Sequence, residues 1–136
     1  MKPTREQILA EPAGRQLNRW VGEYVMGCRE EEDECGLYSL IVPGGVNQLD
    51  FCNPGACWSA VPKYSEEIGP AWQVVEKMAK RHTQDFYFGW KIADGCDWRF
   101  GFDLKSDHCF TEYGVSAESA PEAISKAALL AILENQ

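Results

Sequence analysis

The sequence lacks any apolar run of the roughly 18 residues that a membrane-spanning helix needs. Its first residues include Lys2, Arg5 and Glu6 and form no apolar segment, so we expect no secretory signal peptide there. Apolar residues make up 45% of the chain and charged residues 25%, the balance of an ordinary globular protein. We therefore expect a folded protein that does not enter membranes and stays where it is made.

Basic residues are also scarce. Lysine and arginine number 13 against 21 aspartates and glutamates, which gives a formal net charge of -8. Such a field repels phosphate backbones and argues against binding to extended nucleic acid. A few cations in a cleft still act at short range, because salt screens the distant acids. A pocket for one small anionic ligand is compatible with this charge; the alternative is that the charge only keeps the protein soluble.

Short catalytic signatures are missing as well. The chain contains no G-x-x-x-x-G-K-[ST], G-x-G-x-x-G, H-E-x-x-H or G-x-S-x-G motif. His108 and Cys109 are a possible base and nucleophile, but neighbours on a strand point to opposite faces. The sequence assigns no catalytic residues and favours a binding protein; a small hydrolase using Asp103 or Glu112 is an alternative.

The length of 136 residues fits one domain, so we expect residues 1–136 to form a single folded unit. Thr4-x-x-Gln7 predicts a capped helix near the amino terminus. Apolar residues at a spacing of three and four then predict one of three main helices over residues 13–26, ending at Gly27.

Two further main helices are expected in the second half of the chain. Ser65 is placed to cap the first, whose inward stripe is predicted to comprise Ile68, Trp72, Val75, Met78 and Ala79. The capping box Ser119-x-x-Glu122 opens the second. Its run over residues 123–133 is apolar on nearly every side, which predicts burial between two layers or at a subunit interface.

Alternating apolar and polar residues predict strands over residues 85–92 and 98–104, joined by a turn at Asp94-Gly95. A third strand is expected over residues 109–113. We expect the phenylalanines of the first two strands to face the core together; these are Phe86, Phe88, Phe100 and Phe102.

The pattern breaks over residues 28–62, which are predicted to form a variable insert. An acidic run occupies residues 30–34, and two short apolar pieces at 37–42 and 46–51 flank Pro43-Gly44-Gly45. These two pieces predict a small hairpin.

Four of the six cysteines lie in the insert: Cys28, Cys35, Cys52 and Cys57. Four thiolates can hold a tetrahedral zinc ion, which makes zinc the one cofactor that the sequence suggests. The six residues between Cys28 and Cys35 exceed the usual spacing, and free thiols are the alternative.

Aromatic rings in irregular sequence form the candidate ligand site. A ring beside Lys63 or an arginine can stack on a planar ligand while the cation meets a phosphate. The candidate ligand-binding residues are Trp58, Lys63, Tyr64, Tyr38, Arg81 and Arg99. The alternative is that these rings only pin the insert to the domain.

Two segments resemble the phage ABA-sandwich family. Residues 64–78, YSEEIGPAWQVVEKM, are similar to its YS.DI..AWEVVEKM stretch, and residues 117–130, AESAPEAISKAALL, resemble its A.TAPEAI.RAALLA ending. The resemblance, which also includes residues 5–9 and 25–27 near the amino end, implies an α+β fold. It further implies a layered αβα sandwich with a small antiparallel sheet and a phage or prophage origin. It implies no activity and no catalytic residues.

These observations lead to one leading hypothesis and two alternatives. The leading hypothesis is a non-catalytic phage accessory protein that counters host defence by sequestering a nucleotide-derived immune signal in the bacterial cytoplasm. The first alternative is an inhibitor whose acidic residues 30–34 dock on a basic host protein. The second is a small hydrolase. In each case we expect a homo-oligomer.

Overall fold

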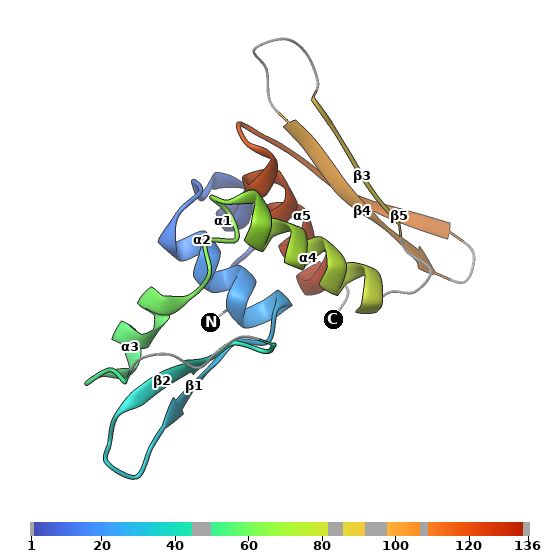
Figure 1. The fold of residues 1–136 in the computed structure, drawn as a ribbon. Coiled ribbons are helices and arrows are strands. Elements are labelled where there is room, and N and C mark those ends of the chain that lie inside the picture. Colours follow the sequence, from blue (N-terminus) through green and yellow to red (C-terminus); the bar gives the residue numbers. More distant parts are fainter. Residues whose placement is uncertain (1, 45–49, 82–85, 92–97, 107–108, 135–136) are drawn as a thin grey trace.

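The helix α5 (Ala120–Glu134) forms the centre of the molecule. The computed structural model describes residues 2–44, 50–81, 86–91, 98–106 and 109–134. Every residue from 123 to 132 is buried, which confirms the predicted burial on all sides. Figure 1 shows the reason: α5 lies between a three-stranded sheet and the amino-terminal helices. Ser119 caps the helix, since its Oγ accepts a hydrogen bond from the Glu122 amide at 3.4 Å.

The three-stranded sheet consists of β3 (Phe86–Lys91), β4 (Trp98–Ser106) and β5 (Cys109–Ala117). The strands are antiparallel in the order β3-β4-β5, and α5 packs against β4 and β5. All three predicted strands are confirmed, although β4 and β5 extend beyond their predicted ends. The predicted turn at Asp94-Gly95 lies outside the described residues.

The register of β3 and β4 corrects the prediction that four phenylalanines face the core together. Phe88 pairs with Gly101 and Gly89 with Phe100. Because directly opposed residues share a face, Phe88 occupies the face away from Phe100. Phe100 and Phe102 are the buried pair, with ring centroids 5.6 Å apart. The register therefore places the phenylalanines of the two strands on opposite faces of the sheet.

The amino-terminal segment forms α1 (Arg5–Ala10), α2 (Arg15–Trp20) and a π-helical turn, η1 (Val21–Val25). The capping box at Thr4 is confirmed by reciprocal hydrogen bonds with Gln7, and α2 with η1 confirms the helix predicted over residues 13–26. The helical run stops before Gly27, whose φ of 77° is in the left-handed region. These elements pack on α5.

Helix α4 (Ile68–Arg81) lies beside α5, and its buried face differs from the predicted stripe. The buried residues are Ala71, Val74, Val75 and Met78. Ile68 is 60% exposed, Trp72 is 44% exposed and Ala79 is exposed as well, so the prediction that these three face inward was wrong. Ser65 does not cap the helix either, because its side chain bonds to Asn18 and Gly14 in the amino-terminal segment.

The insert contains β1 (Arg29–Glu32), β2 (Tyr38–Ile41), α3 (Pro54–Cys57) and a 3-10 turn, η2 (Trp58–Ala60). The acidic strand β1 pairs with β2, a pairing that the sequence did not predict. The Asp33 carboxylate closes the turn by accepting hydrogen bonds from the Cys35 and Leu37 amides. Phe51 also forms an antiparallel bridge with Tyr38, which agrees with the predicted pairing of residues 37–42 with 46–51. Residues 46–49 of that second piece lie outside the described ranges.

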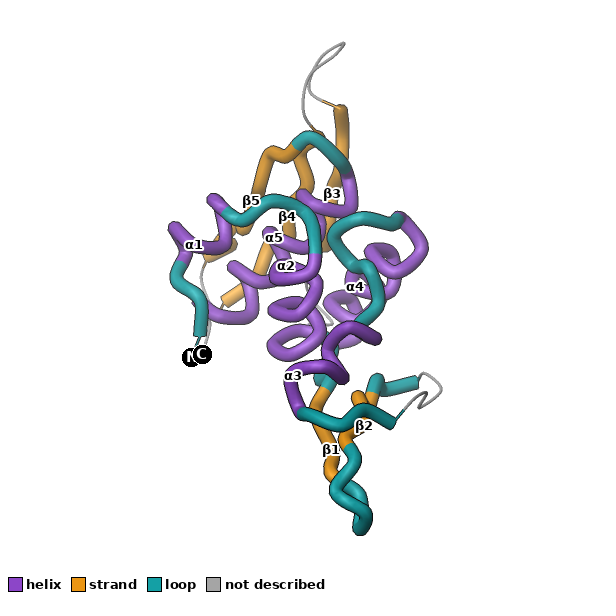
Figure 2. Tube along the Cα trace, turned by 90° about the vertical axis from the view of Figure 1, so that its left-hand side faces the viewer, coloured by secondary structure: helices purple, strands orange, loops and turns teal. Residues whose placement is uncertain are grey.

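The chain mixes helix and antiparallel sheet, which confirms the α+β class. Figure 1 shows α4 and α5 on the same face of the three-stranded sheet, with α1 and α2 on the side of α5 that is away from the sheet. The insert projects from the helices on the side away from that sheet, as Figure 2 also shows. Among the described elements no helix lies on the other face of the sheet. None of the described helices combines the length and apolarity that crossing a bilayer requires.

Candidate functional site

Two clefts lie where the insert meets the helices. The arginine cleft is lined by Arg15, Gln16, Arg19, Gly55 and Trp58 and has a volume of about 320 Å³. The lysine cleft has a volume of about 570 Å³. It is lined by Met26, Val42, Pro43, Gly44, Pro62, Pro70, Gln73, Glu76, Lys77 and Lys80. Both volumes are within the range of small-molecule sites.

A stacked pair forms one wall of the arginine cleft. The guanidinium carbon of Arg19 lies 4.8 Å from the centroid of the Trp58 ring, a cation-π arrangement. The Trp58 indole Nε1 donates a 2.5 Å hydrogen bond to the Glu30 carboxylate, and Arg19 Nη2 lies 3.9 Å from the same oxygen. Trp58 is only 7% exposed. The insert therefore fixes the ring, and the ring positions Arg19.

The second cation of the arginine cleft comes from the preceding helical turn. Arg15 and Arg19 are four residues apart on α2, so their side chains lie on the same face of the helix. Arg15 forms no ion pair within the described part of the chain, whereas Arg19 is close to Glu30. Two guanidinium groups against one carboxylate leave excess positive charge in an otherwise acidic protein. This arrangement suits a small anion.

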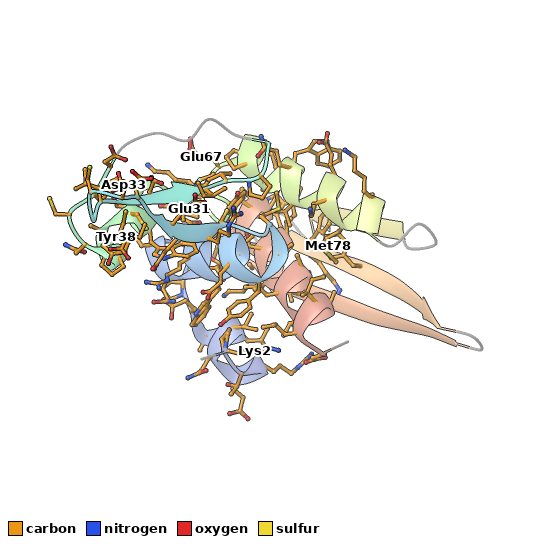
Figure 3. All side chains as sticks on the ribbon, turned by 90° about the horizontal axis from the view of Figure 1, so that it is seen from below. Lys2, Glu31, Asp33, Tyr38, Glu67 and Met78 are labelled. Atoms are coloured by element: carbon orange, nitrogen blue, oxygen red, sulfur yellow. The ribbon has the colours of Figure 1, made fainter. Side chains whose placement is uncertain are left out.

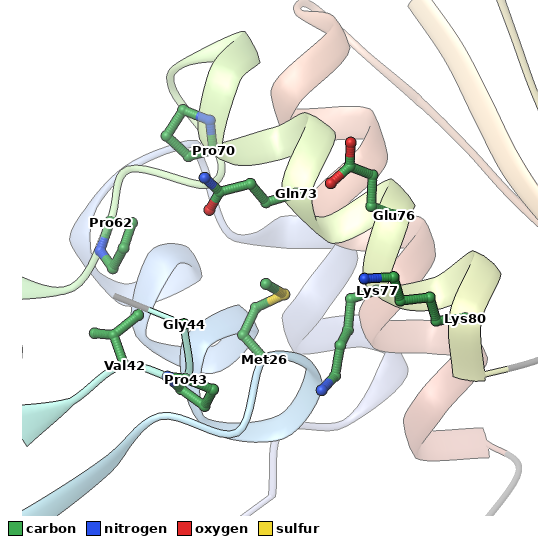
Figure 4. A pocket seen from close by; sticks show the side chains of 10 residues that line it. All are labelled: Met26, Val42, Pro43, Gly44, Pro62, Pro70, Gln73, Glu76, Lys77 and Lys80. Atoms are coloured by element: carbon green, nitrogen blue, oxygen red, sulfur yellow. The ribbon is translucent and has the colours of Figure 1, made fainter. Parts of the chain in front are cut away.

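The lysine cleft combines an apolar wall with two cations. Figure 4 shows the side chains of α4 along one side and Val42, Pro43 and Pro62 along the other. Lys77 is half-buried and Lys80 is exposed. The polar groups are concentrated on α4, and the apolar groups come mainly from the insert and the loop after it.

The structure does not bring the six predicted ligand-binding residues together. Trp58 alone lines one of the two clefts. Lys63 is exposed outside them, and Tyr38 is half-buried on β2 with backbone hydrogen bonds to Phe51. Arg99 lies on β4, where its Nη1 donates a 3.4 Å hydrogen bond to Ser116. Arg81 is the last residue of α4, and its side chain lies outside the described part.

Tyr64 is fully buried and lines neither cleft. Its hydroxyl lies 3.9 Å from Cys28 Sγ, within the core. Burial, followed by the neighbouring Cys28, raises the pKa of the Tyr64 phenol far above its ordinary value. This tyrosine therefore stays neutral and serves the core.

The sequence analysis did not identify Arg15, Gln16 and Arg19 as site residues. They lie off the apolar stripe of their helix, which is also where solvated side chains lie. The spacing of four residues between Arg15 and Arg19 was the feature that could have indicated the site. It indicates a site only once the structure places Trp58, which is distant in sequence, against Arg19.

The four insert cysteines separate into two buried and two exposed residues. Cys28 and Cys57 are buried, and Cys57 Sγ donates a 3.0 Å hydrogen bond to the Pro54 carbonyl; Cys35 and Cys52 are exposed. Burial raises the pKa of the Cys28 and Cys57 thiols, which disfavours the thiolates that zinc needs. No group of three or more potential metal ligands occurs among the residues that the structure describes. Zinc binding stays a prediction, which metal analysis of protein purified without chelators tests.

The hydrolase alternative depends on Asp103 and Glu112. The register pairs these two residues on β4 and β5, but their side chains lie outside the described part, as does His108. No catalytic geometry is therefore available for the alternative.

A comparison with protein-family models matches residues 19–129 to the phage ABA sandwich domain. Comparisons with curated proteins and with solved structures gave no match. The matched segment includes α4, the first ten residues of α5 (120–129), the strands β1 to β5 that the structure describes and the whole insert.

Proposed function

Because the chain belongs to the phage ABA sandwich domain family, we propose that it is a non-catalytic phage accessory protein that binds a small anionic ligand in the arginine cleft. The observation that carries this proposal is the Arg19 guanidinium stacked on Trp58. Holding a long side chain such as that of Arg19 in one conformation costs conformational entropy. This cost is offset when the hydrogen-bond donors and the flat face of the guanidinium group contact a ligand.

The geometry favours a ligand that has both a planar ring and a phosphate. The Arg19 guanidinium carbon lies over the Trp58 ring, so a heterocycle can stack on the guanidinium group only from a side that Trp58 leaves open. Arg15, one turn away, then supplies donors for bidentate hydrogen bonding to phosphate. Nucleotides and nucleotide-derived signals unite these two groups in one molecule of suitable size for this cleft.

The biological role that follows is capture of a nucleotide-derived immune signal of the host. A phage protein that binds such a signal stoichiometrically removes it without any catalytic group, in keeping with the absence of catalytic signatures from the sequence. The strongly acidic surface disfavours polymeric nucleic acid while the cleft supplies local positive charge. Such a protein acts in the host cytoplasm, where the signal is made.

Calorimetric titration with a panel of cyclic nucleotides and ADP-ribose derivatives tests the proposal. We expect one or more to bind, and Arg19→Ala to weaken that ligand by at least about tenfold, the equivalent of roughly 1.4 kcal/mol. Arg29→Ala is the matched control, because Arg29 is an exposed arginine outside the cleft. Titrations without heat on folded protein would reject the proposal. Native mass spectrometry of the same samples reports the subunit number and tests the expected homo-oligomer.

A second candidate is an inhibitor that docks through the acidic strand β1. All four residues of β1 are exposed, and Figure 3 shows Glu31 and Asp33 on the insert, away from the three-stranded sheet. Glu30 must be left intact in any test, because it anchors Trp58. Glu31→Lys with Glu32→Lys should abolish capture of a basic host protein and preserve nucleotide binding. Capture that survives this reversal counts against an acidic docking surface.

A further inference from the structure

We propose that the lysine cleft is a second binding site, for an organic anion with an apolar body and a single phosphate or carboxylate group. This site shares no lining residue with the arginine cleft. Its occupant is defined by two features of the cleft, an apolar wall and a pair of adjacent lysines. The proposal goes beyond the function assigned to the arginine cleft and does not depend on it.

The apolar wall comes from three separate parts of the chain. Met26 follows η1, Val42 and Pro43 follow β2, and Pro62 precedes the turn that leads to α4. Pro70, in the first turn of α4, completes this wall. Prolines are rigid and carry no amide hydrogen, so they offer an apolar surface without donors that need satisfying. The body of the ligand that fits this surface is therefore apolar.

The lysines determine the sign of the ligand. Lys77 and Lys80 are three residues apart on α4, so they are neighbours on one helix face, where like charges repel. Neither forms an ion pair within the described part of the chain. Glu76 lines the cleft as well, but Figure 4 shows its side chain and that of Lys77 pointing in different directions. An anion between the two ammonium groups relieves their repulsion.

The position of the lysines at the end of α4 explains only part of this arrangement. The carboxyl-terminal end of a helix favours cations, and that effect accounts for Lys80 in the last turn. It does not account for Lys77 being half-buried beside the apolar wall. Gln73, one turn earlier on the cleft side, adds an amide that can donate to a second oxygen of the anion. The helix thus presents donors and the insert presents apolar surface to the same volume.

The test uses 1-naphthyl phosphate, which carries both required parts, and follows the backbone amides of isotope-labelled protein by NMR. We expect saturable shifts at Met26, Gln73 and Lys77, with inorganic phosphate and 1-naphthol each binding at least about tenfold more weakly. The double variant Lys77→Glu with Lys80→Glu should weaken 1-naphthyl phosphate by a similar factor. Lys63→Glu is the charge control, because Lys63 is an exposed lysine outside both clefts.

A second variant separates loss of the site from loss of the fold. Gln73→Trp fills the cleft from an exposed position and should block the probe while leaving the remaining spectrum intact. The absence of shifts up to millimolar probe, or binding that survives both cleft variants, overturns the proposal. Binding that disappears with Arg19→Ala instead assigns the probe to the arginine cleft and also overturns it. Nucleotide binding at the arginine cleft is measured separately, so the two proposals fail independently.

Discussion

Ser65 and Asn18 are joined by two hydrogen bonds, because the Ser65 amide and hydroxyl donate to the same Asn18 oxygen at 2.8 and 2.6 Å. Both residues are buried. The Asn18 amide nitrogen in turn donates to Glu66 at 2.8 Å. The pair fastens the turn before α4 to α2, so it also sets the distance between the insert's end and the arginine cleft.

Asn18→Ala should lower the free energy of unfolding by about 2 to 3 kcal/mol, since it leaves the buried Ser65 amide without its acceptor and leaves the hydroxyl only the Gly14 carbonyl at 3.4 Å. Urea denaturation monitored by circular dichroism measures the change. Gln16→Ala, an exposed position on the same helix, is the control and should change stability by less than about 0.5 kcal/mol. An equally small effect of Asn18→Ala would show that the network does not stabilise the fold.

Lys126 is a second buried polar anchor, 5% exposed in the centre of α5. Its ammonium group donates to the Leu9 carbonyl at 3.0 Å and to Glu122 at 3.1 Å. Lys126→Met should cost about 2 to 4 kcal/mol, because a largely buried carboxylate and a helix-end carbonyl lose their partner. Adding Glu122→Gln should recover part of the loss. If the single variant is as stable as the parent in urea, the anchor is unimportant.

Ser125 presents the opposite case. Its hydroxyl is buried, and within the described part of the chain it has no hydrogen-bond partner. Ser125→Ala removes an unsatisfied polar group and introduces a better helix former, so we expect a gain of about 1 kcal/mol. The measurement is thermal unfolding, with Ser119→Ala as a contrasting variant that loses the cap of α5. A lower melting temperature for Ser125→Ala would indicate a hydrogen bond that the structure does not show.

The elements predicted correctly from the sequence are those encoded locally. The capping box at Thr4 and the side-chain cap at Ser119 each involve residues three positions apart. The apolar run of α5 indicates its burial without information from any other segment. The β1 strand was missed for a related reason. Its residues are exposed on both faces, so Glu30, Glu31 and Glu32 show no alternation that a pattern could detect.

The remaining features depend on contacts between distant segments. The pairing of Phe88 with Gly101 is set by the register of two strands, and periodicity within each strand carries no information about it. The arginine cleft exists because Trp58 is packed against Arg19. The residues next to Trp58 and Arg19 in the sequence do not predict this contact. Trp58 was identified from its irregular, proline-flanked context, but the cation beside it was predicted only as Lys63 or an arginine, and Arg19 was not among the candidate ligand-binding residues.

The buried contact between Cys28 and Tyr64 predicts a loss of stability at alkaline pH. Burial raises the pKa of both groups, Cys28 above an ordinary 9.0 and Tyr64 above 10.0. Well below pH 9.0 both groups keep their protons in the folded and unfolded states, so their contribution is fully present. At higher pH the unfolded chain releases protons that the native protein retains, and the free energy of unfolding falls. Urea denaturation between about pH 8 and pH 11 should therefore show a steady decline.

Tyr64→Phe keeps the buried ring and removes the phenol, so its decline over the same interval should be shallower than that of the parent. It should not vanish, because Cys28 still titrates with a raised pKa. Tyr38→Phe, at a half-buried position on β2, controls for the loss of a phenol outside the core. Parallel curves for the parent and Tyr64→Phe would mean that Tyr64 does not retain its proton in the native state. The core around the insert would then have to admit water at the very position where the fold excludes it.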